Sequence, residues 1–300
     1  MAELTMVAVM LTALTAPAWA AWPTDPPKVA LKAAGEEPRE ALRFTIERGI
    51  AQDVTMTTTM SSSTMVDGQP FPPVTSPTMV IAMRMRSSEV RPDGTYRYEY
   101  EVVRADIRTI PDGQEAAAGH VQRVLRSMIG LRGWGRNDAR GRPLENDLRP
   151  PPGIDPSIRG YLDAMKEQLS QMSTMLPEEP VGHGASWTVE TRVVAAGLPL
   201  RQVSTYTLTK RTGQVLDLKV EVEQEALEQT VKTPDGEFRI EEWLARGAGE
   251  MRLDLGAPAP VRSVMRTSAT TEMSSMAEGR RQTLRQQQYV DMVILSERRD

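Results

Sequence analysis

The sequence of 300 residues contains no cysteine, and this absence excludes several kinds of site. Without a thiol the chain forms no disulfide, holds no metal through sulfur and has no cysteine nucleophile. An exported chain without disulfides depends on its hydrophobic core alone, which favours one large domain over several small ones.

Histidine is almost as scarce, since only His120 and His183 occur. No H-x-x-x-H or H-x-E spacing is present, so the sequence predicts no histidine-based metal site. A G-x-S-x-G elbow, a glycine-rich phosphate loop and a G-x-G-x-x-G motif after a strand are also missing. We therefore predict no catalytic residue, no metal and no cofactor, and we interpret the chain as a non-enzymatic protein.

The chain has no excess of positive charge. Lys and Arg number 36 against 40 Asp and Glu, which gives a formal net charge of −4. Proteins that bind nucleic acids usually carry a basic footprint, so we expect no nucleic-acid partner. Hydrophobic residues at 40% and charged residues at 25% are typical of a soluble globular protein.

Long apolar runs are also rare, and the one that stands out is Met6–Ala20, MVAVMLTALTAPAWA. It ends with small residues at positions −3 and −1 before Ala21, as signal-peptidase sites do, although Glu3 is the only charge before it. It is shorter than the roughly 20 residues of a membrane-spanning helix. We predict a cleaved signal peptide over residues 1–20, and hence a secreted or periplasmic protein with no integral membrane span after cleavage. An uncleaved anchor is the alternative.

Residues 21–41 are rich in proline and alanine, and we interpret them as a linker. From Leu42 on, apolar and polar residues alternate with the period of 2 that is typical of strands. This alternation predicts strands over 42–46, 54–60, 79–85, 96–102, 203–209 and 216–222, and a closing hairpin of 261–276 and 282–296. Turn residues such as Arg91-Pro92-Asp93-Gly94 separate the runs, so hairpins and antiparallel pairing are expected.

The period changes to 3.6 in the middle of the chain. A first apolar stripe predicts a helix over about 115–130, with Val121, Val124, Leu125, Met128 and Ile129 on one face. Asp155 is a favourable N-cap with Pro156 behind it, which predicts a second helix over 156–176. Its stripe comprises Ile158, Tyr161, Leu162, Met165, Leu169 and Met172.

Together these patterns predict an α+β fold. Long antiparallel strands form a curved sheet or open barrel, and the two helices pack on its concave face. We expect residues 42–297 to make a single β-rich domain in two halves.

The segment 176–190, LPEEPVGHGASWTVE, joins the two halves as a structural hinge. Pro177 and Pro180 end the preceding helix, because proline lacks an N–H group and crowds the turn before it. Gly182 and Gly184 give the backbone freedom for a tight re-entry. Trp187 then opens an alternating run, and we expect it to be largely buried.

Methionine is unusually frequent, with 18 residues, many of them on strand faces. Its flexible thioether fills irregular cores, and it also suits an adaptable apolar cavity. Dense methionine clusters bind Cu(I), but only Met83/Met85 and Met273/Met276 approach that spacing. Core filling is the favoured interpretation, the cavity is second and copper third. The residues predicted to line a cavity are Met79, Ile81, Met83, Met85, Tyr96, Tyr98 and Tyr100.

The hinge carries the pattern P-x-x-P-V-x-x-G-x-x-W, with Pro177, Pro180, Val181, Gly184 and Trp187 at the defined positions. It resembles a turn in a family of uncharacterised secreted bacterial β-rich proteins, which implies no known activity. More distantly, the long strands and two lid-like helices are similar to periplasmic lipoprotein carriers of the LolA/LolB type. That similarity implies a curved sheet closed by helices over an apolar cavity.

The sequence is compatible with two functions. The chain is a cell-envelope protein that binds an apolar ligand, a lipid or a lipidated partner in a sheet-lined cavity, or it is a structural or interaction protein with a filled core. A cavity of roughly 300 Å³ or more would favour the first, because drug-sized ligands need that space.

Overall fold

The computed structural model describes residues 26–150, 174–195, 198–226, 230–233, 236–277 and 280–299. Strands make up 67% of the described residues, and one helix of 13 residues is described. The predicted α+β class with two packed helices is therefore wrong, and the fold is nearly all β. The helix predicted over 156–176 falls mainly on residues 151–173, which lie outside the described residues, and 174–176 are not helical.

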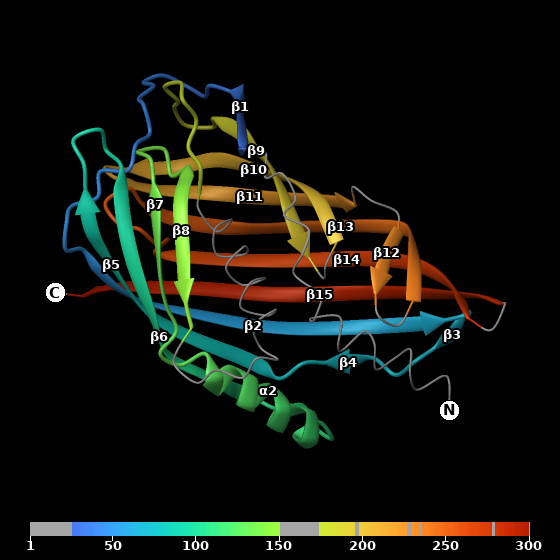
Figure 1. Cartoon of the computed structure of the whole chain (residues 1–300). Helices are drawn as coiled ribbons and strands as arrows, with labels where there is room; N and C mark the ends of the chain where they lie inside the picture. The colour runs from blue at the N-terminus through green and yellow to red at the C-terminus, as the bar shows by residue number, and fades with distance from the viewer. Residues whose placement is uncertain are drawn as a thin grey trace.

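Fifteen strands form one large open antiparallel sheet, drawn in Figure 1. Its order is β1-β9-β10-β11-β13-β14-β15-β2-β5-β6-β7-β8, while β12 pairs with β13, and β3 and β4 pair with β2. The strands of the N-terminal half are β1 (Lys28–Ala33), β2 (Ala51–Val66), β3 (Gln69–Pro70), β4 (Val74–Thr75), β5 (Thr78–Val90), β6 (Tyr96–Thr109), β7 (Arg132–Asn137) and β8 (Pro143–Arg149). Those of the C-terminal half are β9 (Ser186–Ala195), β10 (Leu198–Thr212), β11 (Val215–Ala226), β12 (Thr230–Thr233), β13 (Gly236–Asp254), β14 (Arg262–Ala277) and β15 (Arg280–Arg299).

The hairpin turns form where the sequence predicts them. Gly94, between β5 and β6, has a φ of +80°, a left-handed conformation that glycine adopts without steric cost. The Asp93 carboxylate accepts a hydrogen bond from the Thr95 N–H at 2.9 Å and closes the turn. Asp138 acts in the same way between β7 and β8, since one oxygen accepts from the backbone N–H groups of Arg140 and Arg142.

Two segments differ from their predicted structure. Leu42, Phe44 and Ile46 are buried in alternation as predicted, but they form no strand. The backbone of this segment hydrogen-bonds to residues in turns and not to a neighbouring strand of the sheet. Lys28–Ala33, inside the range interpreted as a linker, forms β1 and pairs with β9 at one edge of the sheet.

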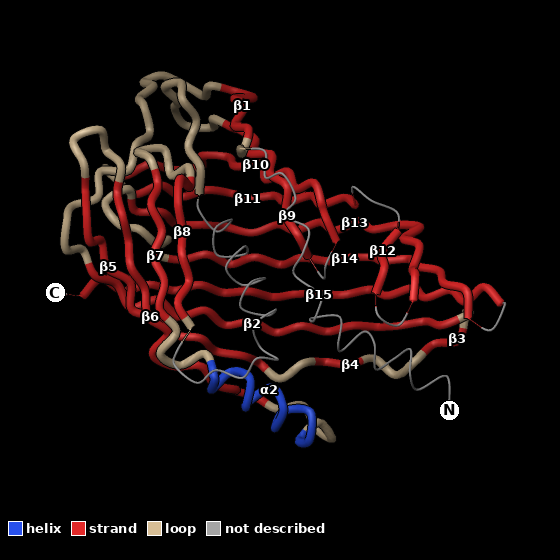
Figure 2. The backbone as a smooth tube through the Cα atoms, in the orientation of Figure 1, coloured by secondary structure: helices blue, strands red, loops and turns tan. Residues whose placement is uncertain are grey.

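The sheet bends strongly between β2 and β6. Figures 1 and 2 show β10, β11, β13, β14, β15 and β2 running side by side, while β5 to β8 stand at a steep angle to them. The β5–β6 pairing contains three register shifts, near Met79, Met83 and Ser87, and bulges of this kind increase bend and twist. As a result, Tyr96 of β6 packs in one cluster with Leu216 of β11 and Leu253 of β13.

The core consists of two main clusters on the inner face of this bend. The larger one surrounds Trp187 and includes Phe44, Tyr96 and Leu253. The second lies between β2, β5, β6, β15 and the single described helix, α2 (Glu115–Ser127). The first predicted helix is present as α2. Leu125 and Met128 of its predicted stripe are buried in this cluster and Val121 packs against it, whereas Ile129, beyond the end of the helix, is 44% exposed.

Candidate functional site

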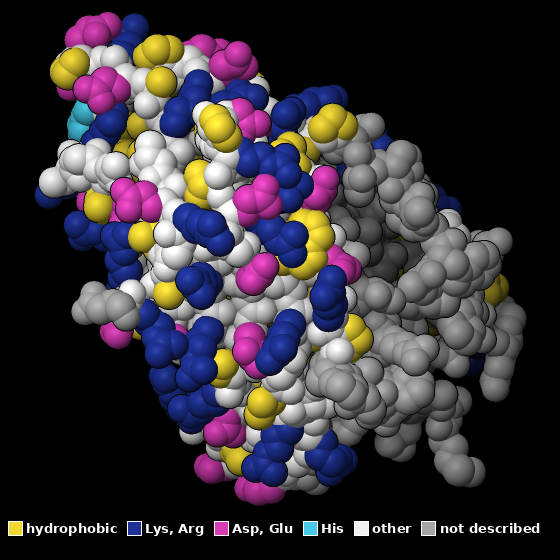
Figure 3. Space-filling model, turned by 60° about the vertical axis from the view of Figure 1, so that its left-hand side comes forward, with side chains coloured by type: hydrophobic (Ala, Val, Ile, Leu, Met, Phe, Trp, Pro, Cys, Tyr) yellow, Lys and Arg dark blue, Asp and Glu magenta, His cyan; other side chains and the backbone are white. Residues whose placement is uncertain are grey.

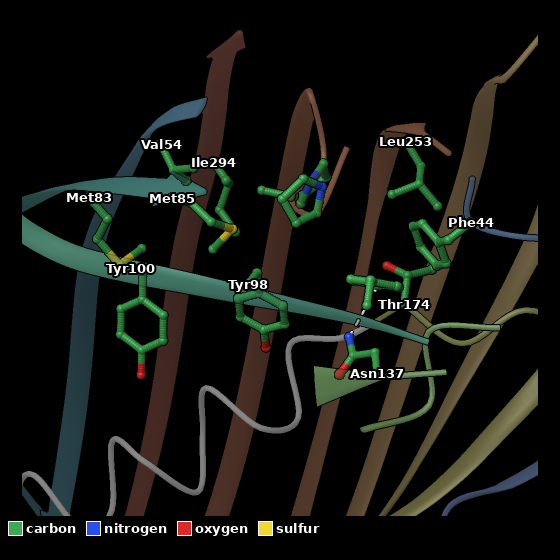
Figure 4. Close-up of a pocket in the computed structure, with 14 residues that line it drawn as sticks. Phe44, Val54, Met83, Met85, Tyr98, Tyr100, Asn137, Thr174, Leu253 and Ile294 are labelled. Atoms are coloured by element: carbon green, nitrogen blue, oxygen red, sulfur yellow. Dashed lines mark hydrogen bonds between the residues drawn. The ribbon is translucent and has the colours of Figure 1, made fainter. Parts of the chain in front are cut away.

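The bend encloses a cavity of about 80 Å³, and five of the seven predicted lining residues surround it. They are Met83, Met85, Tyr96, Tyr98 and Tyr100. In Figure 4 the two methionines lie at one end with Val54 and Ile294, and Phe44 and Leu253 lie at the other. The remaining two candidates, Met79 and Ile81, pack in the neighbouring cluster beneath α2.

Two glycines of β7 determine where the tyrosines lie. Tyr100 is paired with Gly133 and Tyr98 with Gly135 across the β6–β7 ladder. A Cβ atom on Gly133 would meet the Tyr100 hydroxyl, and one on Gly135 would meet the Tyr98 ring. Both tyrosine rings therefore pack directly against the backbone of the glycine opposite, where a side chain would block them. The sequence R-G-W-G-R of β7 is a signal for this arrangement, because glycine in a strand often marks such a close approach.

The hydroxyl groups of Tyr96 and Tyr100 stay protonated at neutral pH. Burial raises the pKa of Tyr96 well above its usual value, and the hydrogen bond that its oxygen accepts from Asn137 Nδ2 at 3.2 Å opposes this only in part. Burial also raises the pKa of Tyr100. A neutral phenol serves as a polar tip for orientation and not as a general base.

A band of methionines continues from the cavity along the inner face of the sheet. Residues opposite each other on antiparallel strands share a face. The register aligns Met265 with Met292, which faces Thr58, and Thr58 faces Met79. The next row on the same face aligns Met251, Ser263, Ile294 and Met56. We call Met56, Met79, Met251, Met265 and Met292 the methionine band; all five are half-buried.

The connection between β13 and β14 forms one wall of the cavity. Pro258, Ala259 and Pro260 line it, although no sequence pattern predicts this role for them. The buried Gln52 of β2 holds this connection, since its Oε1 accepts from the Ala259 N–H at 3.0 Å and its Nε2 donates to the Ser296 hydroxyl at 2.9 Å. Contacts of this kind join residues more than 200 positions apart, so no local pattern predicts them.

The predicted hinge lies behind the site as part of the larger cluster. Trp187 is fully buried, its ring stacks on Tyr206 at 5.7 Å, and its Nε1 donates to the Met175 carbonyl at 2.8 Å. Gly182 packs so closely on the Glu36 carbonyl that no side chain fits there. Gly184 has a φ of +75°, which favours glycine.

The chemistry of the site is that of an apolar surface with a few neutral polar tips. Among the described residues no cluster of His, Asp or Glu is arranged to hold a metal ion. In the same part of the chain no helix is long and apolar enough to cross a membrane. The site therefore suits apolar contact, with Asn137, Thr174 and the tyrosine hydroxyls as its polar groups.

Comparison with known proteins gives a family of unknown function, DUF6263, whose model matches residues 162–241. The match is consistent with an uncharacterised family, but it confirms neither the turn pattern nor the similarity to LolA/LolB-type carriers. No curated protein matches the chain.

A solved structure, that of Ail, the attachment invasion locus protein of Yersinia pestis in complex with the heparin analogue sucrose octasulfate, is similar at 8% identity. The similarity covers 84% of this chain and all of that chain, with a TM-score of 0.16. A TM-score this low supports no argument about the present protein.

Proposed function

We propose that this chain is a non-enzymatic cell-envelope protein that binds an apolar ligand, a lipid or a lipidated partner on the inner face of its sheet. The observation that carries the proposal is the methionine band, which extends an apolar surface from the cavity across five strands. Methionine is flexible and polarizable, so such a surface adapts to ligands of different shape. Tyr98 and Tyr100 at its end add apolar bodies with polar tips.

The size of the cavity favours the alternative, a structural or interaction protein with a filled core. At about 80 Å³ it is well below the roughly 300 Å³ that a drug-sized ligand needs. A ligand would have to displace side chains of the band. Unbranched methionine side chains move with less cost than branched ones, so the band is suited to this displacement.

A binding experiment separates the two functions. The purified full-length protein is extracted with organic solvent, the extract is analysed by mass spectrometry, and binding of a neutral apolar dye is titrated. We expect a lipid in the extract and saturable dye binding. Met265→Trp, which fills the band, should abolish dye binding while the melting temperature changes little.

Val264→Trp is the matched control, because Val264 precedes Met265 on β14 and its side chain lies on the opposite face. It should leave dye binding unchanged. If Met265→Trp instead lowers stability by about 1–3 kcal/mol, the typical cost of overpacking, and no lipid is extracted, the core is filled and the proposal fails.

The proposed location in the cell envelope rests on the sequence of residues 1–20. Export should remove them and leave Ala21 as the first residue. N-terminal sequencing of the exported protein tests this, and material that begins at Met1 would contradict it.

A further inference from the structure

The opposite face of β5 to β8 carries a second, wider hollow of about 700 Å³. Side chains alternate faces along a strand, and Arg84 and Arg86 alternate with Met83 and Met85 of the cavity. The described residues that line the hollow include six arginines and no lysine: Arg84, Arg86, Arg97, Arg132, Arg149 and Arg299. Figure 3 brings this side of the molecule forward and shows blue Lys and Arg side chains gathered on it.

The register brings like charges together in this hollow. Arg132 of β7 lies directly opposite Arg149 of β8, a placement that destabilises a sheet. Arg86 and Arg299 lie opposite Ala51 from the two neighbouring strands. Neighbouring strands are about 4.8 Å apart, so an oxyanion above the small Ala51 side chain is within reach of both guanidinium groups.

The positive charge of the hollow is only partly neutralised. Four of the arginines, Arg97, Arg132, Arg149 and Arg299, form ion pairs with Glu99, Glu101, Asp147 and Asp53 at 3.2–3.6 Å. The side chains of Arg132, Arg149 and Arg299 are 70%, 74% and 48% exposed, and exposed pairs of this kind are weak. Among the described residues Arg84 and Arg86 form no ion pair within 4 Å, although the register places Arg84 opposite Asp53 and Glu101 and Arg86 opposite Glu99.

The count of charges leaves the hollow positive. Six arginines line it against the two glutamates Glu99 and Glu101. Adding Asp53 and Asp147, the further partners of its arginines, still leaves two positive charges in excess. The chain as a whole is negative, at −4, so the excess is local to this hollow.

Arginine rather than lysine indicates the kind of anion. The planar guanidinium group offers paired N–H donors that match two oxygens of a phosphate group, whereas lysine acts as a point charge. Arg97 is held in place, since its guanidinium lies 4.0 Å from the centre of the Trp134 ring. We propose that the hollow binds a phosphate-bearing ligand, with one phosphate above Ala51 between Arg86 and Arg299. The arginines lie on the other face of the sheet, although Met85 and Tyr100 line both the cavity and the hollow, and the site does not rest on the proposed apolar function.

Calorimetry on the full chain tests the site with two probes. Inorganic pyrophosphate represents a free phosphate ligand, and vesicles of phosphatidylcholine with and without phosphatidic acid represent a lipid headgroup. The variant is Arg86→Gln/Arg299→Gln. The control is Arg104→Gln/Arg266→Gln, which removes the same charge at two side chains that are 66% and 84% exposed and do not line the hollow.

We expect at least a tenfold loss of affinity in the first variant and a change of less than twofold in the control. A loss measured with pyrophosphate supports a free ligand, and a loss measured only with phosphatidic acid vesicles supports a lipid headgroup. The proposal is overturned if neither probe binds the wild type, or if both variants weaken binding equally, since that would reflect net charge alone.

Discussion

At the scale of single residues, Trp187 is the side chain that joins the hinge to the core. Its ring stacks on Tyr206 at an interplanar angle of 17°, and its indole N–H satisfies the Met175 carbonyl just before the hinge. Leu31 of the edge strand β1 is its partner on the other side. One aromatic residue therefore fixes three segments of the chain together.

Replacing Trp187 by alanine should lower the free energy of unfolding by about 3–5 kcal/mol, because it leaves a cavity and an unpaired carbonyl. Urea denaturation followed by circular dichroism measures this. Tyr289→Ala is the control, since Tyr289 is 48% exposed and should change stability by less than about 0.5 kcal/mol. Equal effects of the two substitutions would show that the hinge is peripheral to the fold.

Tyr206, the partner of Trp187, gives a dependence on alkaline pH. Burial raises its pKa from 10.0 to about 12, so the folded state keeps the proton after the unfolded state has lost it. Its contribution to stability is complete below pH 10 and decreases as the pH rises from 10 to 12. The free energy of unfolding should fall by up to about 1.4 kcal/mol per pH unit through this residue.

The measurement compares wild type and Tyr206→Phe in urea between pH 8 and 11.5. Lysines titrate in the same range, so the difference between the two proteins isolates the tyrosine. We expect the difference in free energy of unfolding between the two proteins to be constant up to about pH 10. Above that pH the wild type should lose stability relative to the variant. A constant difference over the whole range would mean that Tyr206 ionises normally in the folded protein.

At the scale of elements, β7 shows how a strand with little side-chain volume shapes the site. Gly135→Ala places a methyl group against the Tyr98 ring and should cost about 1–3 kcal/mol, as overpacking does. Removing the ring as well, in Gly135→Ala/Tyr98→Ala, should make the glycine substitution nearly free of cost. The double-mutant cycle gives this coupling energy directly.

Gly119→Ala is the matched control for that cycle. Gly119 lies in α2 and has open space around it, so alanine should be neutral or should stabilise the helix by about 0.5–1 kcal/mol. If the Gly135 and Tyr98 effects are simply additive, the ring does not depend on the glycine.

Local sequence patterns predict most of these strands. They do not predict the segments whose structure depends on contacts with distant parts of the chain. The alternating runs gave β2, β5, β6, β10, β11 and the β14–β15 hairpin, because each has one buried face. The same alternation at Leu42–Ile46 reflects burial without a ladder. The sequence pattern does not reveal β1, because this short edge strand forms only through its pairing with β9.

The candidate site was predictable to a similar degree. Met83, Met85 and the three tyrosines share strand faces that the sequence displays. Phe44, Leu253 and the Pro258–Pro260 wall come from distant segments that meet only when the sheet bends. The bend itself depends on register shifts in β5–β6, which period-2 patterns do not reveal.

At the scale of the whole molecule, the two halves seen in the sequence are joined by strand pairing. β2 lies between β5 of its own half and β15 at the end of the chain, with Ala51 facing Arg299 and Leu284 facing Val66. β1 pairs with β9 beyond the hinge. Figure 1 shows the result, in which blue β2 lies beside red β15 in one continuous sheet. We therefore expect the hinge to connect two parts of a single cooperative unit.

We expect that fragments 26–176 and 177–300 do not fold separately. Alone, the second fragment would expose β15 as an edge of 20 residues without its partner, and the first would expose β2 in the same way. Long unpaired edges cause aggregation rather than stable folding. Each fragment should give a poorly dispersed NMR spectrum and no cooperative melt, whereas mixing both from urea should restore the dispersion of the intact chain. A cooperative melt of the fragment 177–300 alone would show that the C-terminal half is an independent domain, and that the β2–β15 pairing only docks one domain on another.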